Sequence, residues 1–406
     1  MFHFFTDKNL MGDRNHALAI AETFKEKYPS GQVMIKEWTG DQFLEFKKEV
    51  LNQNLKVPNL NKAIVCGIGT AGLKVLKRIS EESELELKNK LFTVFSSHQF
   101  IEEAIDLQGK INIMAFDENA IDEEILEKLK SADEKARKDH QNYHYIKTQI
   151  VTMNGIPHRV TSSFVRSALD NWRKNLTVKA IPPADRYIAV ILGGDAPDSL
   201  NKQRYFLPEE AAVFAEFIAK EAREMGATVL VTNGPRTGKF NPVTGEDLFA
   251  AGKVHKESKE GKELELDKVT KAFENVLKTK EVSYLLVNYI KKEPQPPSAY
   301  QPFIGLVLEN PTAKMYVTID SSSNMSEIRD VLPKTQLNLV QIGSANATHI
   351  KQMESILREG RAQGFVVDKV EKSVKPISII ATDLANVARE PAAETVATAI
   401  VHGVKS

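Results

Sequence analysis

The stretch YIAVILGGDAPD, residues 187–198, joins six apolar residues to a turn that contains two glycines and two aspartates. A short apolar run that ends in a Gly-rich turn is typical of a strand and its following loop in a parallel α/β sheet. Ligands of such sheets bind at the carboxyl ends of the strands. The two glycines therefore predict either close approach of a ligand to the backbone or a simple tight turn.

The same alternation of short apolar runs with longer helical segments continues along almost the whole chain. Strands are predicted at residues 2–6, 32–38, 63–66, 91–96, 111–115, 149–152, 187–192, 228–232, 282–288, 314–319 and 337–342. Helices are predicted at residues 16–27, 71–82, 118–138, 162–174 and 383–401, with others opening near Pro208, Asp267, Asn324 and Ala347. The predicted fold class is α/β, built on parallel sheets.

The chain has 406 residues, which at roughly 150 residues per domain predicts two or three domains. We place the linker within residues 176–186, because Pro182 and Pro183 each remove a backbone donor and disfavour helix before them. The expected divisions are residues 1–180, residues 181–385 and a terminal helix in residues 386–406.

Composition excludes several classes of protein. Lys+Arg and Asp+Glu both number 54, so the net charge is zero and broad nucleic-acid binding is disfavoured. Cys66 is the only cysteine, which excludes internal disulfides and thiolate metal clusters. No apolar run reaches the ~18 residues of a membrane helix, and the first residues show no secretory pattern. We therefore expect a cytoplasmic protein without a membrane span, in which the charged residues 254–267 form a solvated loop.

A Gly-rich loop follows the third predicted strand. Gly67, Gly69 and Gly72 match the G-x-G-x-x-G pattern of dinucleotide-binding sites. The next strand ends at Ser96, without the carboxylate that would bind the ribose of NAD. The alternative is that these glycines let the following helix pack close to the sheet, with or without a ligand above them.

Residues 234–240, GPRTGKF, form a second candidate loop. Its glycines are one residue too close for a P-loop, and Phe240 stands where a P-loop has Ser or Thr. Arg236, Thr237 and the backbone N–H groups can still bind a phosphate, because a guanidinium matches phosphate oxygens bidentately. A structural turn is the other interpretation.

The third loop, DSSSNMSE at residues 320–327, is rich in hydroxyl groups. These groups and the N-terminus of the next helix can donate several hydrogen bonds to one oxyanion. The same residues suit helix capping, with Ser323 or Asn324 as the N-cap and Ser326 or Glu327 near the third helical position. Both roles can coexist, since a cap uses one residue of the eight.

His98 follows the apolar run LFTVFSS at the carboxyl end of a predicted strand. A general base can face a cleft from that position, and the alternative is a loop or core histidine. The sequence has no HExxH pair and no Asp-x-Asp of the kind that holds a metal against a diphosphate. We therefore expect no metal site.

Taken in order, these segments resemble the ELM-type mitochondrial fission family, whose architecture is similar to that of GT-B glycosyltransferases. TDKNLMGDRNHALAIAE at residues 6–22 resembles the family's first strand, glycine loop and helix, with His16 where glutamine is usual. Pro235 and Gly238 depart from the family's Arg-Arg-Thr-Pro turn, and Ser323 departs from the valine that follows its Asp-Ser pair. Further matching segments are NGIPHRVTSS (154–163), VILGGDAPD (190–198), VTNGPRTG (231–238), QPFIG (301–305) and YVTIDSSSNMSE (316–327).

The resemblance implies two Rossmann-like domains that face a central cleft, with the terminal helix packing back on the N-terminal domain. It implies a metal-independent GT-B-like glycosyltransferase that needs no cofactor and acts on a nucleotide-sugar and an unknown acceptor. The implied nucleotide-diphosphate residues are Gly193, Gly194, Arg236, Thr237, Ser321, Ser322, Ser323, Asn324, Ser326 and Glu327, with Glu327 on the ribose diol. The implied acceptor-side residues are Gly12, Arg14, Gly67, Gly69 and Gly72, with His98 or Asp13 as the base that takes the acceptor's proton.

The same family also implies a different class of function. Its plant members are fission factors that recruit a protein partner, so the alternative is a non-catalytic scaffold or adaptor. A cleft can persist after chemistry has been lost. Whether the chain is an enzyme is left open by the sequence.

Overall fold

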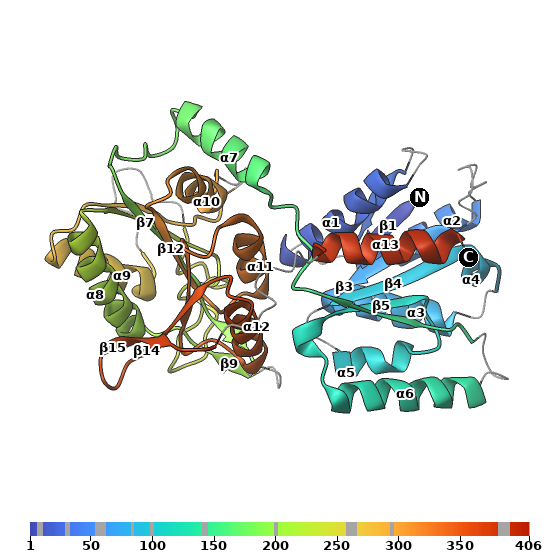
Figure 1. Ribbon diagram of the computed structural model, residues 1–406. Helices are drawn as coiled ribbons and strands as arrows, with labels where there is room; N and C mark the ends of the chain where they lie inside the picture. The colour runs from blue at the N-terminus through green and yellow to red at the C-terminus, as the bar shows by residue number, and fades with distance from the viewer. Residues whose placement is uncertain are drawn as a thin grey trace. The chain divides into compact units, whose positions relative to one another are not determined.

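The computed structural model describes residues 1–5, 11–28, 33–52, 62–82, 85–97, 101–139, 145–198, 202–256, 266–292, 296–380 and 390–405. Contacts divide the chain into two compact units. Unit 1 comprises Met1–Arg159 and Ala388–Ser406, and unit 2 comprises Val160–Val387. In Figure 1 each unit consists of a sheet flanked by helices.

Within the described residues, unit 1 contains a six-stranded parallel sheet in the order β2-β1-β3-β4-β5-β6. The strands are β1 (Phe2–Phe5), β2 (Ile35–Trp38), β3 (Ala63–Ile68), β4 (Leu91–Ser97), β5 (Ile113–Asp117) and β6 (Gln149–Met153). The chain adds β2 on one side of β1 and all later strands on the other side. The strand order therefore reverses between β1 and β3, and ligands of such sheets bind beside this point, beyond the carboxyl ends of the strands.

Different helices cover the two faces of the unit 1 sheet. Side chains alternate between the faces, so that Phe4 packs in one apolar cluster and the next residue, Phe5, in the other. The first cluster includes α1 (Met11–Lys27) and α13 (Ala392–Lys405). The second includes α2 (Phe43–Asn52), α3 (Gly69–Glu81), α4 (Leu85–Asn89), α5 (Ile101–Ala104) and α6 (Glu123–Lys138). Short 3-10 turns lie at Gly40–Gln42, Ile105–Leu107 and Glu118–Ala120.

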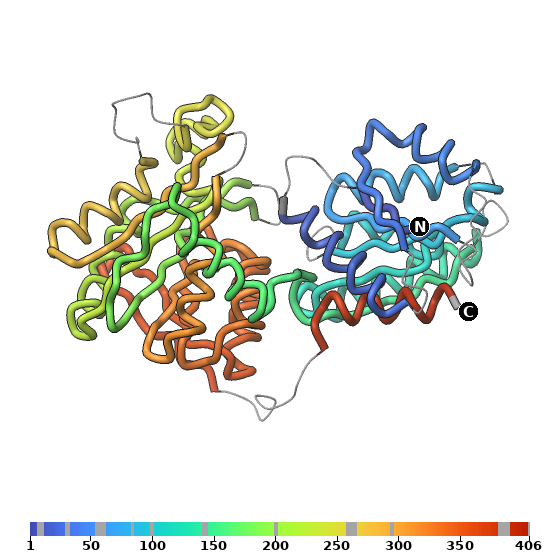
Figure 2. The backbone as a smooth tube through the Cα atoms, turned by 90° about the horizontal axis from the view of Figure 1, so that it is seen from above, coloured from blue at the N-terminus to red at the C-terminus, as the bar shows by residue number. Residues whose placement is uncertain are grey.

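The last helix of the chain, α13, belongs to unit 1. It lies alongside α1, as Figures 1 and 2 show from two directions. Val396 and Ile400 are fully buried in the first apolar cluster. A Cβ atom at Gly403 would lie 2.5 Å from the Phe92 ring, so the end of the helix packs directly on β4. The C-terminal segment thus completes one face of the sheet that begins the chain.

The part of unit 2 that the structure describes contains a seven-stranded sheet in the order β11-β10-β7-β12-β13-β14-β15. Its strands run parallel, except that β15 is antiparallel to β14. They are β7 (Tyr187–Leu192), β10 (Thr228–Asn233), β11 (Tyr284–Val287), β12 (Lys314–Thr318), β13 (Leu337–Gln341), β14 (Gln363–Asp368) and β15 (Ser373–Ile377). A small hairpin is formed by β8 (Ala196–Pro197) and β9 (Gln203–Arg204). The strand order reverses between β7 and β12, so the loops after these two strands flank the expected ligand position.

Helices also cover both faces of the unit 2 sheet. One apolar cluster includes α7 (Ser162–Lys174), α10 (Tyr300–Glu309), α11 (Ser322–Val331) and α12 (Ala347–Arg358). The other includes α8 (Pro208–Met225) and α9 (Lys268–Thr279). Helix α8 has a proline in its first turn and ends at Gly226, whose φ of 64° suits a residue without a side chain.

The α/β class and the parallel sheets predicted from the sequence are confirmed. The division between the units lies earlier than the Pro182-Pro183 stretch, because α7 packs within unit 2. Trp172 on α7 meets Phe303 on α10 with ring centroids 6.5 Å apart. A Cβ atom at Gly305 would lie 2.4 Å from the Val165 carbonyl oxygen, so the two helices are in close contact. The central cleft implied by the family resemblance stays a prediction.

Acid should destabilise unit 1 through His3 on β1. Trp38 Nε1 donates to His3 Nδ1 (2.9 Å), and the His3 ring is fully buried. Burial, assisted by the N-terminal amine and by Lys36, lowers the pKa of His3 from 6.5 to about 3. Between these two values the unfolded chain binds a proton that the folded chain excludes. The free energy of unfolding therefore falls as the pH falls below 6.5, by about 1.4 kcal/mol per pH unit.

Urea unfolding between pH 7 and pH 4 measures this dependence. The variant His3→Asn keeps an acceptor for Trp38 at the position of Nδ1 but cannot titrate, so its stability should fall less steeply with acid. The chain has two tryptophans, and a Trp172→Phe background leaves Trp38 as the reporter of unit 1. The exposed His402, replaced by Asn, is the matched control. Equal slopes in the wild type and His3→Asn would exclude His3 as the source.

Candidate functional site

Three loops of unit 2 meet at the carboxyl edge of the sheet, beside the point where the strand order reverses. They follow β7, β10 and β12. The Gly193 N–H donates to the Thr318 hydroxyl at the end of β12 (2.7 Å), and the Gly194 N–H donates to the Asp320 carboxylate (2.9 Å). The Gly-Gly turn is therefore bonded directly to the end of the neighbouring strand.

Close approach of protein groups accounts for both glycines of this turn. A Cβ atom at Gly193 would lie 1.5 Å from Asp320 Oδ1. At Gly194 it would lie 2.1 Å from the carbonyl of Arg236. These contacts give the glycines the role that the tight-turn interpretation predicts, and they bring the three loops together. Close approach of a ligand to this turn stays a prediction.

Asp320 is the central hydrogen-bond acceptor of this edge. Its side chain is buried, and its carboxylate accepts hydrogen bonds from Gly194, from the Thr318 hydroxyl (2.8 Å) and from Arg236 Nη2 (3.3 Å). Arg236 Nη2 also donates to the Asp320 carbonyl (3.1 Å). The Arg236 side chain is 41% exposed. A guanidinium has five N–H groups, so Arg236 can neutralise Asp320 and still donate to a ligand.

Thr237 is a buried residue that stabilises the loop and is not exposed at its surface. It is fully buried, and its hydroxyl lies 2.7 Å from the Gly193 carbonyl and 3.2 Å from the Leu192 carbonyl. The same oxygen accepts the Gly234 N–H (3.1 Å). Thr237 thus joins the 234–240 loop to the end of β7. The family resemblance assigned both Arg236 and Thr237 to the diphosphate, and of these two only Arg236 has an accessible polar group.

Asp195 anchors the same loop from a second side. Its carboxylate accepts N–H groups of Phe206 (3.0 Å) and Phe240 (2.9 Å), and its own N–H donates to the Arg236 carbonyl (2.9 Å). Burial raises the pKa of Asp195 to about 6, against the effect of the two backbone hydrogen bonds. The sequence identified this aspartate only as part of a turn, because its partners are backbone groups distant along the chain.

The N-cap of α11 is Ser321, not Ser323 or Asn324 as the capping pattern predicts. The Ser321 hydroxyl accepts the Asn324 N–H (3.4 Å), and the helix begins at Ser322. Any of the three consecutive serines could have been the N-cap. Because the first of them, Ser321, is the N-cap, the helix begins two residues after Asp320. Ser323 and Asn324 are half-buried in the first turn.

Two other serines of this edge differ in what they contact. The Ser326 hydroxyl donates to the Ser322 carbonyl (3.0 Å) and accepts from Gln352 Nε2 on α12 (2.9 Å), so it joins two helices. Ser322 Oγ is buried without a hydrogen-bond partner in the described part of the chain, and so is Ser344 Oγ in the loop before α12. A buried hydroxyl that lacks a partner costs free energy, so these two atoms are candidates for ligand contact.

Glu327 lies one turn into α11, beside the buried hydroxyl of Tyr300 on α10. Burial, together with the negative charge of Glu327, raises the pKa of Tyr300 well above its usual value. The Glu327 side chain is half-buried. Its expected role on a ribose diol stays a prediction.

Unit 1 brings some of the acceptor-side residues together where its strand order reverses. The Asp13 carboxylate, in the first turn of α1, packs against Gly69 at the start of α3, where a Cβ atom would lie 2.2 Å from Asp13 Oδ2. Arg14 pairs with Glu37 on β2, with Nε and Oε2 2.8 Å apart. A Cβ atom built at Gly12 would meet no described atom within 4 Å beyond its chain neighbours and the backbone of α1.

Helix packing accounts for the other two glycines of the G-x-G-x-x-G segment. A Cβ atom at Gly72 would lie 2.4 Å from the Gly67 carbonyl carbon. One at Gly67 would lie 2.8 Å from the Gly72 carbonyl oxygen. The first turn of α3 therefore touches the end of β3. His98, the predicted base, lies outside the described residues.

Sequence reasoning missed a buried polar pair in unit 1. His16 Nε2 on α1 lies 2.9 Å from Ser96 Oγ on β4. Both residues are almost inaccessible to solvent, and Ser96 Oγ also lies 3.8 Å from Met153 Sδ. The pair therefore ties α1 to the sheet, which gives a structural reason for a histidine at this position.

The prediction of a solvated loop at residues 254–267 is wrong at both ends of that stretch. His255 and Asp267 are each 1% exposed. Asp267 is the N-cap of α9, where its carboxylate accepts the Thr270 N–H (2.9 Å) and Asn233 Nδ2 (3.2 Å). Residues 257–265 lie outside the described residues. Because the sequence between His255 and Asp267 is rich in charged residues, it predicted exposure for the whole stretch.

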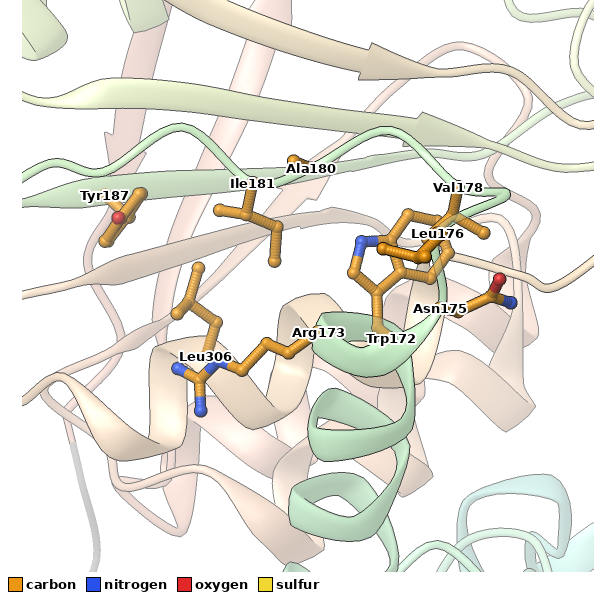
Figure 3. A pocket seen from close by; sticks show the side chains of 9 residues that line it. All are labelled: Trp172, Arg173, Asn175, Leu176, Val178, Ala180, Ile181, Tyr187 and Leu306. Carbon is orange, nitrogen blue, oxygen red and sulfur yellow. The ribbon is translucent and has the colours of Figure 1, made fainter.

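A separate cavity of about 360 Å³ lies near the amino end of β7. Figure 3 shows it between the end of α7, the segment that follows this helix, the start of β7 and α10. Tyr187 opens β7 here, whereas Gly193 follows the other end of the strand, so the cavity is not part of the candidate site. Its lining residues are Trp172, Arg173, Asn175, Leu176, Val178, Ala180, Ile181, Tyr187 and Leu306.

The described residues offer neither a membrane-spanning helix nor a metal-binding cluster. No helix among them is both long enough and apolar enough to span a membrane. The described His, Cys, Asp and Glu residues form no group of three or more that could hold a metal ion.

No protein-family profile matches the chain, and no curated protein matches it. Among solved structures, the chain is similar to an Escherichia coli protein described as "Trehalose-6-phosphate from E. coli bound with UDP-2-fluoro glucose". The identity is 9%, the TM-score is 0.40, and the match covers 99% of this chain and 91% of that chain. Membership of the fission family stays a prediction from the motifs. Function must therefore be derived from the side chains of the site.

Alanine at Gly194 should destabilise unit 2, because the added Cβ atom would meet the Arg236 backbone at 2.1 Å. Overpacking of this kind costs about 1–3 kcal/mol. Gly234→Ala is the matched control in the adjoining loop, since its Cβ atom would meet no atom of the described residues within 4 Å beyond its chain neighbours. Urea unfolding reported by Trp172 in a Trp38→Phe background measures both variants. If Gly194→Ala were as stable as Gly234→Ala, the two loops would not approach this closely.

Proposed function

We propose that the protein is a metal-independent, GT-B-like glycosyltransferase and that unit 2 binds the diphosphate of its nucleotide-sugar donor. The observation that carries this proposal is the half-exposed guanidinium of Arg236, fixed by Asp320 directly beside the N-terminus of α11. A helix N-terminus and a guanidinium are both favourable partners for phosphate oxygens. The site also lies where the strand order reverses, which is the usual ligand position of such sheets.

Several groups would share the diphosphate. Only Nη2 of Arg236 is used by the described residues, so its other N–H groups remain for one phosphate. In the first turn of α11 the Asn324 N–H is bonded to the Ser321 hydroxyl, and the N–H groups of Ser322 and Ser323 would face the same anion. Ser322 Oγ, on the first residue of α11, is a buried hydroxyl that a phosphate oxygen would satisfy. Gly193 and Gly194 would shape this site without donating, because their N–H groups bind Thr318 and Asp320.

The proposed reaction moves a sugar from the diphosphate to an acceptor. The bond between the anomeric carbon and the diphosphate oxygen breaks, and a bond from that carbon to the acceptor oxygen forms. The acceptor's proton passes to a base, for which Asp13 or His98 of unit 1 is proposed. The nucleoside diphosphate leaves with its added negative charge, which Arg236 and the α11 dipole would stabilise. Glu327 would bind the ribose diol.

Thermal unfolding with a panel of UDP, GDP, CDP, TDP and their sugars tests the donor site. A ligand at one hundred times its dissociation constant stabilises the folded state by about 2.7 kcal/mol, which is a rise in Tm of about 5 °C or more for a unit of this size. Arg236→Ala should lose most of that rise. NAD and ATP are the comparison ligands.

The matched control is Arg358→Ala, which removes an exposed arginine of α12 that pairs with Glu354 (3.1 Å). This variant should keep the full rise in Tm with the nucleotide that stabilises the wild type. A rise that survives Arg236→Ala would place the nucleotide elsewhere. The absence of any rise with the whole panel would contradict the glycosyltransferase proposal and favour a non-catalytic scaffold.

A further inference from the structure

The His255 ring lies between two main-chain carbonyl groups. Its Nε2 atom is 2.9 Å from the Thr237 carbonyl oxygen, and its Nδ1 atom is 3.2 Å from the Tyr289 carbonyl oxygen. The first carbonyl belongs to the loop that carries Arg236, and the second follows β11. His255 thus bridges two segments that are distant in the sequence, one of which carries Arg236.

A carbonyl oxygen can only accept a hydrogen bond. A neutral imidazole has one N–H donor, so it can bond to one of these carbonyls and must turn a lone pair toward the other. Only the doubly protonated imidazolium donates to both. Both contacts have the direction that a ring N–H donor requires. The geometry is therefore complementary to the charged form of His255.

The backbone of His255 is also held in an uncommon conformation. Its φ is 56°, in the left-handed region that residues with a side chain seldom adopt, and the residue is 1% exposed. Lys291 N–H donates to the His255 carbonyl (2.8 Å), which fixes the main chain in place. A conformation of this kind persists only where its surroundings determine it, and such positions cluster at functional sites.

A carboxylate, an ammonium and two aromatic rings lie around His255. Asp267 at the start of α9 interacts with it: burial raises the pKa of Asp267, and the charge of His255 acts in the opposite direction. Asp195, which also holds this loop, interacts through its charge with Asp267. The other neighbours are the rings of Phe249 and Tyr289, which meet the imidazole at large interplanar angles, and the ammonium of Lys291, which lies over the Phe249 ring.

We propose that His255 is the positioning residue of the Arg236 loop and holds this loop in its binding geometry when both ring nitrogens are protonated. The inference rests on the proposed nucleotide site and adds its regulation by pH. Loss of the second proton removes one of the two bonds that tie Thr237 to the end of β11. The adjacent Arg236 is then held on fewer sides, and the affinity for the nucleotide-sugar falls as the pH rises.

The protonation of His255 can be observed without any ligand. Nitrogen-15 NMR of the histidine rings between pH 5 and pH 8.5 should show one ring with two bonded N–H protons at the lower pH, and a His255→Gln sample assigns it. A His255 ring with a single protonated nitrogen across this whole range would overturn the proposal. This readout is independent of whether unit 2 binds a nucleotide.

Two variants separate the two hydrogen bonds. The amide nitrogen of Gln corresponds in reach to Nε2, so His255→Gln should keep the bond to Thr237 and lose the titration. The amide nitrogen of Asn corresponds to Nδ1, so His255→Asn should keep the bond to Tyr289 and release Thr237. Asn also tolerates the left-handed backbone, which makes it the fair comparison for folding.

Affinity for the stabilising nucleotide-sugar is measured between pH 5.5 and pH 8.5. A nucleotide-sugar is used because the terminal phosphate of a nucleoside diphosphate itself titrates near pH 6. The wild type should lose about tenfold in affinity over this range, the loss of roughly one hydrogen bond to a charged group. His255→Gln should bind at pH 8 at least as well as the wild type and keep only the smaller dependence that Asp195 contributes. His255→Asn should bind about tenfold more weakly at every pH.

The control variant is His402→Gln, an exposed histidine of α13, which should keep the wild-type profile. Equal weakening by Gln and Asn, with an unchanged pH dependence, would show that His255 only fills space and would overturn the proposal. If no nucleotide-sugar binds at all, the proposed function fails, and the ring protonation measured by NMR still decides whether His255 holds the loop in the charged form.

Discussion

The buried carboxylate of Asp320 is the interaction on which the unit 2 edge depends. It accepts hydrogen bonds from Gly194 after β7, from Thr318 on β12 and from Arg236 after β10. A charge taken out of water needs such donors, because an unpaired buried charge costs several kcal/mol. The same need restricts the sequence nearby, since a side chain at Gly193 would overlap the carboxylate. One buried anion thus sets both the shape of the Gly-Gly turn and the direction of the Arg236 side chain.

Several carboxylates are buried at the carboxyl edge of the unit 2 sheet, although negative charges repel an anionic ligand. Asp195, Asp267 and Asp320 are all buried around the 234–240 loop, and Asp195 interacts through its charge with both of the others. Backbone N–H groups and side-chain donors inside the protein satisfy them. Internal compensation leaves the outward N–H groups of Arg236 and the N-terminus of α11 as the groups that a ligand would meet. That distribution is compatible with the proposed diphosphate site.

Sequence patterns located most strands and the loops that follow them, because an apolar run bounded by turn residues indicates a buried strand. They did not predict β14 and β15 at the far edge of the unit 2 sheet, or the helices α2 and α10. The segments 162–174 and 187–192 have their predicted bounds. The role of each loop residue could not be predicted from the sequence, because one residue type can form hydrogen bonds with several different kinds of partner. Ser321 caps a helix, while Ser326 joins two helices and Ser322 has an unpaired buried hydroxyl. His255 gave no signal, since main-chain carbonyls are its partners and every residue supplies one.

The two units place an aspartate at the same point of their sheets with different electrostatic results. In unit 1 the Asp13 carboxylate lies in the first turn of α1 and against Gly69, which begins α3, so one negative charge compensates two helix N-termini. In unit 2 the guanidinium of Arg236 compensates Asp320, and the first turn of α11 contains no acidic residue. The positive end of the α11 dipole would therefore be left for an anionic ligand. This asymmetry supports the proposed division of donor and acceptor between the two sheets.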